Sequence, residues 1–310
     1  MPYMLVMKNI LITGGTGLVG RRLCQKLKEK GYTPALLSRS APLNSEIKTY
    51  KWDPNKNEID KRALEWADCV IHLAGAGIGD RWWTKRRKQL IVESRIKTGD
   101  LIFEQIEKTK HPLKAFISAS AIGYYGAVSS NKVFGEQDLA ATDFVGEVCR
   151  LWEHSADRFE RLGTRTVKLR IGLVLSPRGG ALEKLATPIK MGIGCALGSG
   201  NQYMPWIHID DLCDMFIKAT EDSGMRGAYN AVAPEHINNK NFTTILAKIL
   251  HKKIWLPPIP SFILKLAFGE RACLFLTGSR VSSEKISREG FQFKFSSLKT
   301  ALLNLLENKT

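Results

Sequence analysis

Residues 9–40, NILITGGTGLVGRRLCQKLKEKGYTPALLSRS, decide the fold of this chain. A short apolar run at 9–13 predicts a strand that leads into a glycine-rich turn. Leucines at helical spacing then predict a helix over 21–31 that ends at Gly31, and a second apolar run at 33–40 predicts another strand. Strand, glycine turn, helix and strand form a βαβ unit, which is the repeating element of parallel α/β sheets.

The same alternation continues along the chain. Further strands are predicted at 68–75, 113–121 and 165–175, with helices at 84–108 and 143–163. This spacing predicts the α/β fold class, with a Rossmann-type doubly wound parallel sheet. After a helix from Ala181 to about Met191 the pattern becomes irregular. We therefore expect a dinucleotide-binding domain of residues 1–176 plus 206–232, and a smaller C-terminal, substrate-side domain of residues 177–205 plus 233–310.

The glycine turn predicts a dinucleotide site. Gly14, Gly17 and Gly20 have the spacing G-x-x-G-x-x-G, and the turn lies between a predicted strand and a predicted helix, as pyrophosphate binding requires. The first glycines permit close approach of the pyrophosphate, the helix N-terminus offers free N–H groups, and Gly20 lets the helix pack on the sheet. A tight turn with no ligand is the alternative.

The end of the second strand indicates which cofactor is bound. An NAD site places Asp or Glu there to accept a hydrogen bond from the ribose 2′-hydroxyl, whereas this chain has Ser38 and Arg39. A carboxylate would repel a 2′-phosphate, and an arginine would hold it. The sequence therefore favours NADP, while an exposed surface cation is the alternative reading of Arg39.

The composition describes a basic globular chain. Of its 310 residues 44% are hydrophobic, and 46 Lys+Arg stand against 30 Asp+Glu. This excess favours phosphorylated ligands, such as a cofactor or a nucleotide-linked substrate. The densest basic stretch, at 81–97, fits an amphipathic helix, and no recognition motif accompanies it, so we expect no nucleic-acid partner.

Two features that the sequence lacks bear on the expected location of the protein and on its expected disulfides and metal sites. No apolar run approaches eighteen residues, and the opening MPYMLVMK is too short for a signal peptide. We therefore expect a soluble cytoplasmic protein with no membrane partner. The six cysteines and six histidines are scattered along the chain, so neither a disulfide framework nor a metal site is expected.

Several stretches resemble the short-chain dehydrogenase/reductase superfamily, in its extended and atypical branches. They are TGGTGLVG for the cofactor loop, DCVIHLAG for the adenine-side strand, FISASAIGYYG for the strand with the family serine, and MPWIHIDDL. A narrower resemblance, to the atypical group called epimerase family proteins, rests on LAGAGI, SRIKT, GSGNQYMPWIHIDDL and the tail ending in GFQFKFSSLKTAL. That group is often described as nucleoside-diphosphate-sugar epimerases and sometimes as cell-division inhibitors. Ser283 stands where the group tends to have proline, which affects a loop.

The resemblance implies which residues hold the cofactor. They are Gly14, Thr16, Gly17 and Leu18 at the pyrophosphate, Ser38 and Arg39 at the 2′-phosphate, and Leu73 and Ala74 along the cofactor wall. Arg95, in SRIKT, falls on a helix that faces the cofactor in the family pattern, which implies a supporting contact. A helical arginine on the protein surface is the alternative.

The proton-transfer pair of the superfamily is missing from this sequence. That pair is Tyr-x-x-x-Lys on a helix, where both side chains share one face and the ammonium lowers the pKa of the tyrosine. None of the seven tyrosines has a lysine four residues later. By spacing, the motif falls in DFVGEVCRLWE, where either Phe144 and Val148 or Val145 and Cys149 occupy the two positions.

Two polar residues near the expected nicotinamide position are the candidate catalytic residues. Ser120 corresponds to the family serine, and Tyr124 follows the serine strand directly. The alternatives are a hydrogen-bonding cap for Ser120 and a cleft wall for Tyr124. Other groups that could reach a cleft are Glu147, His208, Asp210 and Asp211. Their alternatives are a helix-surface charge for the glutamate and a helix start, with either aspartate as N-cap, for the others.

Two functions follow from these observations. The first is an NADP-dependent oxidoreductase or epimerase that acts on a small substrate, with nucleotide-linked compounds among the candidates. The second is a non-catalytic NADP-binding protein whose cofactor occupancy sets a conformation read by a protein partner. Tryptophans that plug the cleft, such as Trp82, Trp83 or Trp206, would favour the second. A homodimer through the helix at 143–162 is expected by analogy.

Overall fold

The computed structural model describes residues 7–40, 46–109 and 111–307. Within them the main sheet has eight strands, in the order β11-β8-β6-β5-β1-β2-β3-β4. They are β1 Asn9–Thr13, β2 Thr33–Ser38, β3 Thr49–Asp53, β4 Glu58–Ile59, β5 Cys69–His72, β6 Ala115–Ala121, β8 Arg165–Ile171 and β11 Gly227–Ala231. All neighbours in this sheet are parallel except the antiparallel pair β3 and β4. The Rossmann-type sheet predicted from the sequence is therefore confirmed.

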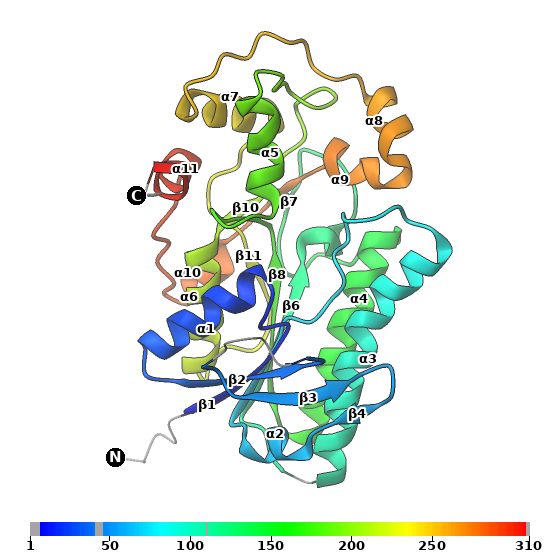
Figure 1. The fold of residues 1–310 in the computed structure, drawn as a ribbon, viewed down its shortest axis with the longest axis vertical. Helices are drawn as coiled ribbons and strands as arrows, with labels where there is room; N and C mark the ends of the chain where they lie inside the picture. Colours follow the sequence, from blue (N-terminus) through cyan, green and yellow to red (C-terminus); the bar gives the residue numbers. More distant parts are fainter. Residues whose placement is uncertain (1–6, 41–45, 110, 308–310) are drawn as a thin grey trace.

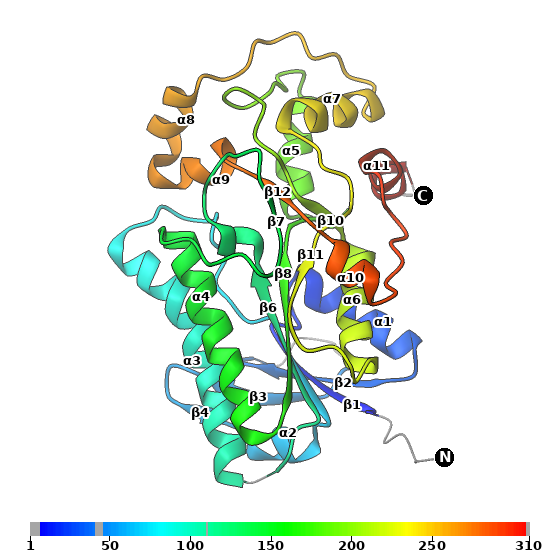
Figure 2. The ribbon, with the colours of Figure 1, turned by 180° about the vertical axis from the view of Figure 1, so that it is seen from behind.

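Helices cover both faces of the sheet (Figures 1 and 2). One face carries α1 Leu18–Glu29 and α6 Ile209–Glu221, and the other carries α2 Lys61–Trp66, α3 Lys85–Thr109 and α4 Phe144–Asp157. Because side chains alternate along a strand, Ile10 and Ile12 lie in the core on the α1 side, and Leu11 lies in the core on the α3 side. Both faces of the central strands are thus buried, as in other parallel sheets.

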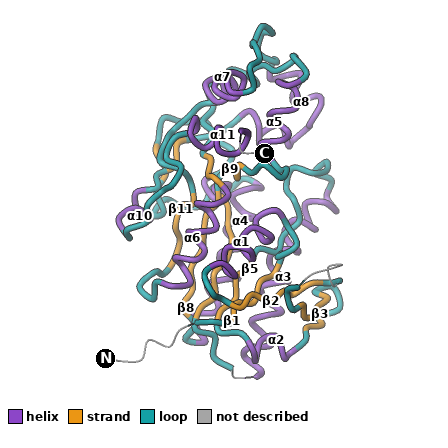
Figure 3. The backbone as a smooth tube through the Cα atoms, turned by 60° about the vertical axis from the view of Figure 1, so that its left-hand side comes forward, coloured by secondary structure: helices purple, strands orange, loops and turns teal. Residues whose placement is uncertain are grey.

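A second group of helices lies beyond the carboxyl ends of the strands (Figure 3). There α5 Ala181–Lys190, α7 Asn239–Ile249 and α11 Leu298–Glu307 share a core with β9 Leu173–Leu175 and β10 Trp206–His208. Trp206 is fully buried in this core, so it plugs no cleft. The remaining elements are η1 Ile122–Tyr125, β7 Val133–Phe134, η2 Arg158–Leu162, α8 Ser261–Phe268, η3 Gly269–Ala272, α9 Cys273–Leu276, β12 Arg280–Val281 and α10 Glu284–Arg288.

The single strand predicted at 165–175 is wrong, because it breaks at Gly172. After β8 the chain leaves the main sheet, and the N–H of Leu173 donates to Pro205 O at 2.8 Å to start the β9–β10 pair. A Cβ on Gly172 would lie 2.6 Å from the same Pro205 oxygen, so only glycine permits the crossing. This break directs the chain from the main sheet into the second core.

The first helix also begins earlier than predicted. It starts at Leu18, with Gly17 as its N-cap in an extended conformation, rather than at residue 21. Lys30 is the C-cap, and Gly31 follows with φ 83°, as its predicted role at the helix end requires. The earlier start brings the glycine turn directly onto the helix N-terminus.

Candidate functional site

The glycine turn after β1 packs tightly against the end of β5. Gly14 has φ 67°, and a Cβ there would lie 2.9 Å from the carbonyl carbon and oxygen of Leu73. A Cβ on Gly20 would lie 2.5 Å from Gly14 O, so this glycine lets α1 approach the turn. Gly14 is therefore required by space as well as by backbone conformation, and Gly20 by space alone.

The N-terminus of α1 is left without a side-chain cap within the described residues. Gly17, its N-cap, supplies no hydrogen-bonding side chain, and Thr16 and Gly17 are both exposed. The N–H groups of the first turn therefore have no side-chain acceptor, and the positive end of the helix dipole faces outward. Such a terminus suits the pyrophosphate of a dinucleotide.

A buried hydrogen-bonded chain holds Leu73 and Ala74, the predicted cofactor wall, in place. Thr13 Oγ1 accepts from the N–H groups of Leu73 and Ala74, both at 3.1 Å, and lies 2.8 Å from Nδ1 of His72. Because the hydroxyl oxygen already accepts twice, its proton goes to Nδ1, and Nε2 of His72 donates to Thr98 Oγ1 at 3.2 Å. Burial lowers the pKa of His72 to about 4, so the ring stays neutral. Sequence reasoning missed this pair.

Ser38 and Arg39 lie at the carboxyl end of β2, next to β1. Ser38 is half-buried, and Arg39 is exposed and makes no hydrogen bond or ion pair with a described residue. A Cβ on Gly15 would lie 2.3 Å from Leu36 Cδ2, which shows how closely the glycine turn packs on β2. Because β1 and β2 are neighbours, Arg39 follows β2 at the same edge of the sheet as the glycine turn. Its guanidinium has no partner among the described residues.

Arg95 is half-buried on α3 and points at the segment after β5. Its guanidinium carbon would lie 3.2 Å from a Cβ on Gly75, and it stacks 4.8 Å from the ring centre of Trp152. Its Nη1 donates to Ile91 O at 2.8 Å, and no carboxylate among the described residues pairs with it. Burial lowers the pKa of this guanidinium. Arg95 is thus half-buried rather than fully exposed, and its contact with a cofactor stays a prediction.

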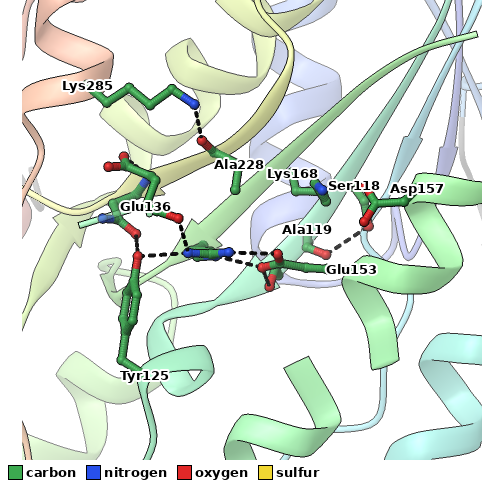
Figure 4. A network of polar contacts seen from close by, with 12 residues as sticks. Ser118, Ala119, Tyr125, Glu136, Glu153, Asp157, Lys168, Ala228 and Lys285 are labelled. Atoms are coloured by element: carbon green, nitrogen blue, oxygen red, sulfur yellow. Dashed lines mark hydrogen bonds and ion pairs between the residues drawn. The ribbon is translucent and has the colours of Figure 1, made fainter. Parts of the chain in front are cut away.

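Ser120 belongs to a buried ion-pair network. Figure 4 shows Tyr125 and Glu153, two members of this network. Its hydroxyl donates to Glu153 Oε1 at 2.7 Å. Arg170 donates to both oxygens of the same carboxylate, at 2.8 and 2.9 Å, and to the Tyr125 hydroxyl at 3.0 Å. Tyr125 in turn donates to Asn230 Oδ1 at 2.6 Å. These contacts join β6, α4, β8, η1 and β11.

Burial and ion pairing fix the protonation states of Arg170 and Tyr125. Burial opposes the charge of Arg170, but the bidentate bond to Glu153 holds the pKa of the guanidinium above its ordinary value. Burial raises the pKa of Tyr125 to about 12, so its phenol keeps its proton. The network orients Ser120, while Arg170 keeps its charge and Tyr125 keeps its proton near neutral pH.

Tyr124 lies at the edge of this network. The guanidinium carbon of Arg170 is 3.5 Å from its ring centre, which fixes the orientation of the ring. Its hydroxyl makes no hydrogen bond to any residue that the structure describes. Of the two candidate catalytic residues, Ser120 is thus engaged with Glu153, and Tyr124 has a free hydroxyl.

The helix that should carry the proton-transfer pair offers no substitute. Phe144 packs edge-on against Trp83, with ring centres 4.9 Å apart, and Lys88 Nζ lies 5.0 Å from the phenyl ring. Burial raises the pKa of Cys149 to about 12, so this thiol keeps its proton. Glu147 is exposed and pairs with Arg150 at 2.6 Å.

The residues of HIDDL are structural. His208, rather than either aspartate, caps α6 by accepting from the N–H of Asp210 at 3.0 Å, which corrects the expected N-cap. Asp210 forms a two-point ion pair with Arg22 of α1, at 2.6 and 3.0 Å. Asp211 accepts from two backbone N–H groups of the C-terminal segment, both at 3.0 Å. The Asp210 pair thus joins α6 to α1, and the Asp211 bonds join α6 to the C-terminal segment.

Known proteins resemble the chain in sequence and structure. Residues 10–232 match the NAD dependent epimerase/dehydratase family, and residues 259–305 match a domain of unknown function, DUF1731. The chain belongs to the NAD dependent epimerase/dehydratase family. Epimerase family protein YfhF of Bacillus subtilis is 35% identical over 303 residues, which cover 97% of this chain and 99% of YfhF. The resemblance stated from the sequence is confirmed.

Two solved structures resemble this chain in fold. Human epimerase family protein SDR39U1, solved with NADPH, is 30% identical and superposes with a TM-score of 0.86 over 97% of this chain and 99% of the human chain. UDP-glucose 4-epimerase of Thermotoga maritima, solved with UDP-glucose, has a TM-score of 0.78 over 96% and 97% of the two chains. Its 20% identity shows a common fold alone.

The described residues lack two kinds of structural feature. No described helix is long and apolar enough to cross a membrane. No group of three or more His, Cys, Asp or Glu side chains in the described part of the chain could hold a metal ion.

Proposed function

We propose that this protein binds NADP along the glycine turn and uses it for oxidoreduction or epimerisation of a small, nucleotide-linked substrate. The observation that carries the proposal is the tight turn at Gly14 and Gly20, which meets an uncapped helix N-terminus. When bound, NADP would supply a hydride acceptor or donor. The pyrophosphate would lie on the N–H groups of α1, held by Thr16, Gly17 and Leu18.

The preference for NADP rests on Arg39 and on one relative. No carboxylate stands at the end of β2 to accept from a ribose 2′-hydroxyl, and Arg39 has no described partner to compete for its guanidinium. The human relative SDR39U1 was solved with NADPH. Arg95, a half-buried cation without a carboxylate partner, would add a second positive group facing the cofactor wall.

The catalytic part of the proposal concerns Ser120 and Tyr124. Because its proton is bound to Glu153, Ser120 can only accept a hydrogen bond, and so can orient a substrate hydroxyl. Tyr124 has a free hydroxyl on a ring held by Arg170, and it is the group we assign to donate a proton to a substrate oxygen.

A second function keeps support from the same residues. With no Tyr-x-x-x-Lys pair and Ser120 bound to Glu153, the chain could bind NADP without turnover and act through a protein partner. Trp83, which packs on Phe144, would then serve to fill the space beside the helix. The two functions differ in whether any carbonyl compound is reduced.

The experiment is a titration of wild type and Arg39→Ala with NADPH and NADH, followed by protein fluorescence. We expect tight NADPH binding that falls about ten-fold or more in the variant, with NADH binding unchanged, because an arginine–phosphate pair contributes roughly 1.5–3 kcal/mol. NADPH oxidation is then measured against a panel of carbonyl compounds and sugar nucleotides, with Tyr124→Phe as the test of the proton donor. NADPH binding without any turnover would support the second function, and failure to bind either nucleotide would refute both.

We infer a cytoplasmic location from the cysteines. All six are free thiols in the structure, and four of them are buried. Reducing compartments keep thiols in this state. Cell fractionation with a cytoplasmic marker tests this inference.

A further inference from the structure

Helix α8 turns its apolar side chains outward. Phe262 is 70% exposed and Leu266 is 83% exposed, and these two residues lie four apart on one face, with Ile263 beside them. Leu264, on the opposite face, is buried against the protein. An ordinary surface helix has the reverse arrangement, with polar residues outward. The outer face of α8 is therefore more apolar than the solvent-exposed face of an ordinary surface helix.

Neighbouring segments extend this apolar face. The linker between α7 and α8 runs over the end of the molecule (Figures 1 and 2). Its Trp255 is 71% exposed, and Met191, just after α5, is 69% exposed. Trp82, in the loop before α3, lies against Gly269 at the end of α8. We call this set the apical surface: Trp82, Met191, Ile193, Ile254, Trp255, Phe262, Ile263 and Leu266.

The backbone holds the apical surface in one arrangement. Trp255 Nε1 donates to Gly192 O at 2.9 Å, which ties the linker to the end of α5. Ile259 exchanges backbone hydrogen bonds of 2.9 Å with Ala196 and Gly198 just before α8 begins. Three prolines in the linker further restrict its backbone. The exposed apolar side chains are thus presented by a fixed framework.

Most segments of the apical surface carry basic side chains and no acidic ones. At its Trp82 edge, Asp80 pairs with Lys184 and Glu270 pairs with Lys88. Residues 236–269 contain no Asp or Glu, and neither do residues 184–209. The exposed cations Lys252 and Lys253 adjoin Trp255, and Lys265 flanks the apolar face of α8. Long lysine side chains can lie along apolar groups while their ammonium groups reach phosphate.

We propose that the apical surface docks on the surface of an anionic phospholipid bilayer. Apolar tips rimmed by lysines match the acyl boundary and the phosphate headgroups of such a membrane. A second copy of the chain fits less well, because the contact would gather Lys252, Lys253 and Lys265 of both copies, and residues 236–269, which carry them, contain no acid to pair with them. The expectation of no membrane partner rested on spanning segments, whereas this attachment lies at the interface.

The test uses the full chain and two kinds of vesicle. We expect it to sediment with vesicles of equal parts phosphatidylcholine and phosphatidylglycerol, but not with phosphatidylcholine alone, and to be released by high salt. The double variant Phe262→Gln/Leu266→Gln should bind at least about ten-fold more weakly, because it removes two apolar side chains from the docked face. Lys252→Gln/Lys253→Gln should weaken binding about five-fold or more.

The matched control is Leu139→Gln. Leu139 is 88% exposed and belongs to none of the apical segments, so its variant should bind vesicles like wild type. Circular dichroism and NADPH titration establish that each variant is folded. The proposal is overturned if wild type ignores anionic vesicles, if the double variant binds as wild type does, or if Leu139→Gln loses as much. It is also overturned if light scattering finds a wild-type dimer that the double variant converts to monomer, since the surface would then join two copies.

Discussion

The hydroxyl of Ser120 donates to Glu153 at 2.7 Å, on a carboxylate that Arg170 already holds at two points. The serine that the superfamily uses beside its tyrosine is thus part of a buried ion pair in this chain. A buried pair of this kind is sensitive to the loss of one member, because the other charge is left without a partner. Its removal is the first prediction.

Glu153→Gln should lower the free energy of unfolding by about 3–5 kcal/mol, because Arg170 stays buried without a carboxylate. Urea denaturation at neutral pH measures the change. The control is Glu147→Gln on the same helix, which breaks an exposed pair with Arg150 and should change stability little. Equal effects of the two substitutions would show that the buried network contributes no more than a surface pair.

Gly14→Ala should destabilise the glycine turn by more than the positive φ of Gly14 alone explains. The control is Gly31→Ala, since Gly31 has φ 83° and open space within 4 Å of a Cβ. Both variants carry left-handed strain, but only Gly14→Ala also meets the Leu73 backbone, at 2.9 Å. We expect Gly14→Ala to be less stable by at least about 1 kcal/mol than Gly31→Ala, and to lose NADPH binding. Thermal unfolding and NADPH titration measure the two effects, and NADPH binding equal to that of Gly31→Ala would contradict them.

Stability should fall as the pH drops from about 6.5 to about 4, in part because of His72. The unfolded histidine takes up its proton near pH 6.5, whereas burial lowers the pKa in the folded state to about 4. Between these values the unfolded chain binds more protons, so acid favours unfolding, by up to about 3 kcal/mol at the lower end. His208, with its pKa also lowered to about 4 by burial, adds a similar slope.

The measurement is urea unfolding at several pH values across this range. His72→Asn should flatten the pH dependence by about half, although it also lowers stability overall because it removes the bonds to Thr13 and Thr98. His251→Asn is the control, because His251 is exposed and its positive φ of 55° suits asparagine. An unchanged slope in His72→Asn would mean that this ring does not titrate as its burial implies.

Arg95→Met should separate cofactor binding from stability. The guanidinium is half-buried without a described carboxylate partner, so its removal should leave the free energy of unfolding unchanged or raise it by about 1 kcal/mol. If the cation faces the cofactor, NADPH affinity should fall about ten-fold. Arg86→Met, at an exposed position on the same helix, is the control for both measurements. A variant that loses stability while keeping NADPH affinity would make Arg95 a purely structural residue.

The fold could be predicted because its signals are local. The apolar run before Gly14, the helical spacing of leucines and the end of α1 at Gly31 all lie within 32 residues, and alternation of such units specifies a parallel sheet. The prediction failed where two backbone segments that are distant in the sequence contact each other. The strand at 165–175 breaks because Gly172 meets Pro205, and a contact between such separated residues leaves no periodic signal in the sequence.

The candidate site divides in the same way. The sequence by itself determined the glycine turn, the missing Tyr-x-x-x-Lys pair and the absence of an acid after β2, since each depends on which residue stands at a given spacing. Only the tertiary structure decided that Ser120 is bound to Glu153, that His72 is bound to Thr13 beside the glycine turn and that α8 turns its apolar face outward. Those outcomes depend on which strands become neighbours and which face of a helix meets the core. Sheet order and helix packing settle both, and they bring together side chains that lie far apart in the chain.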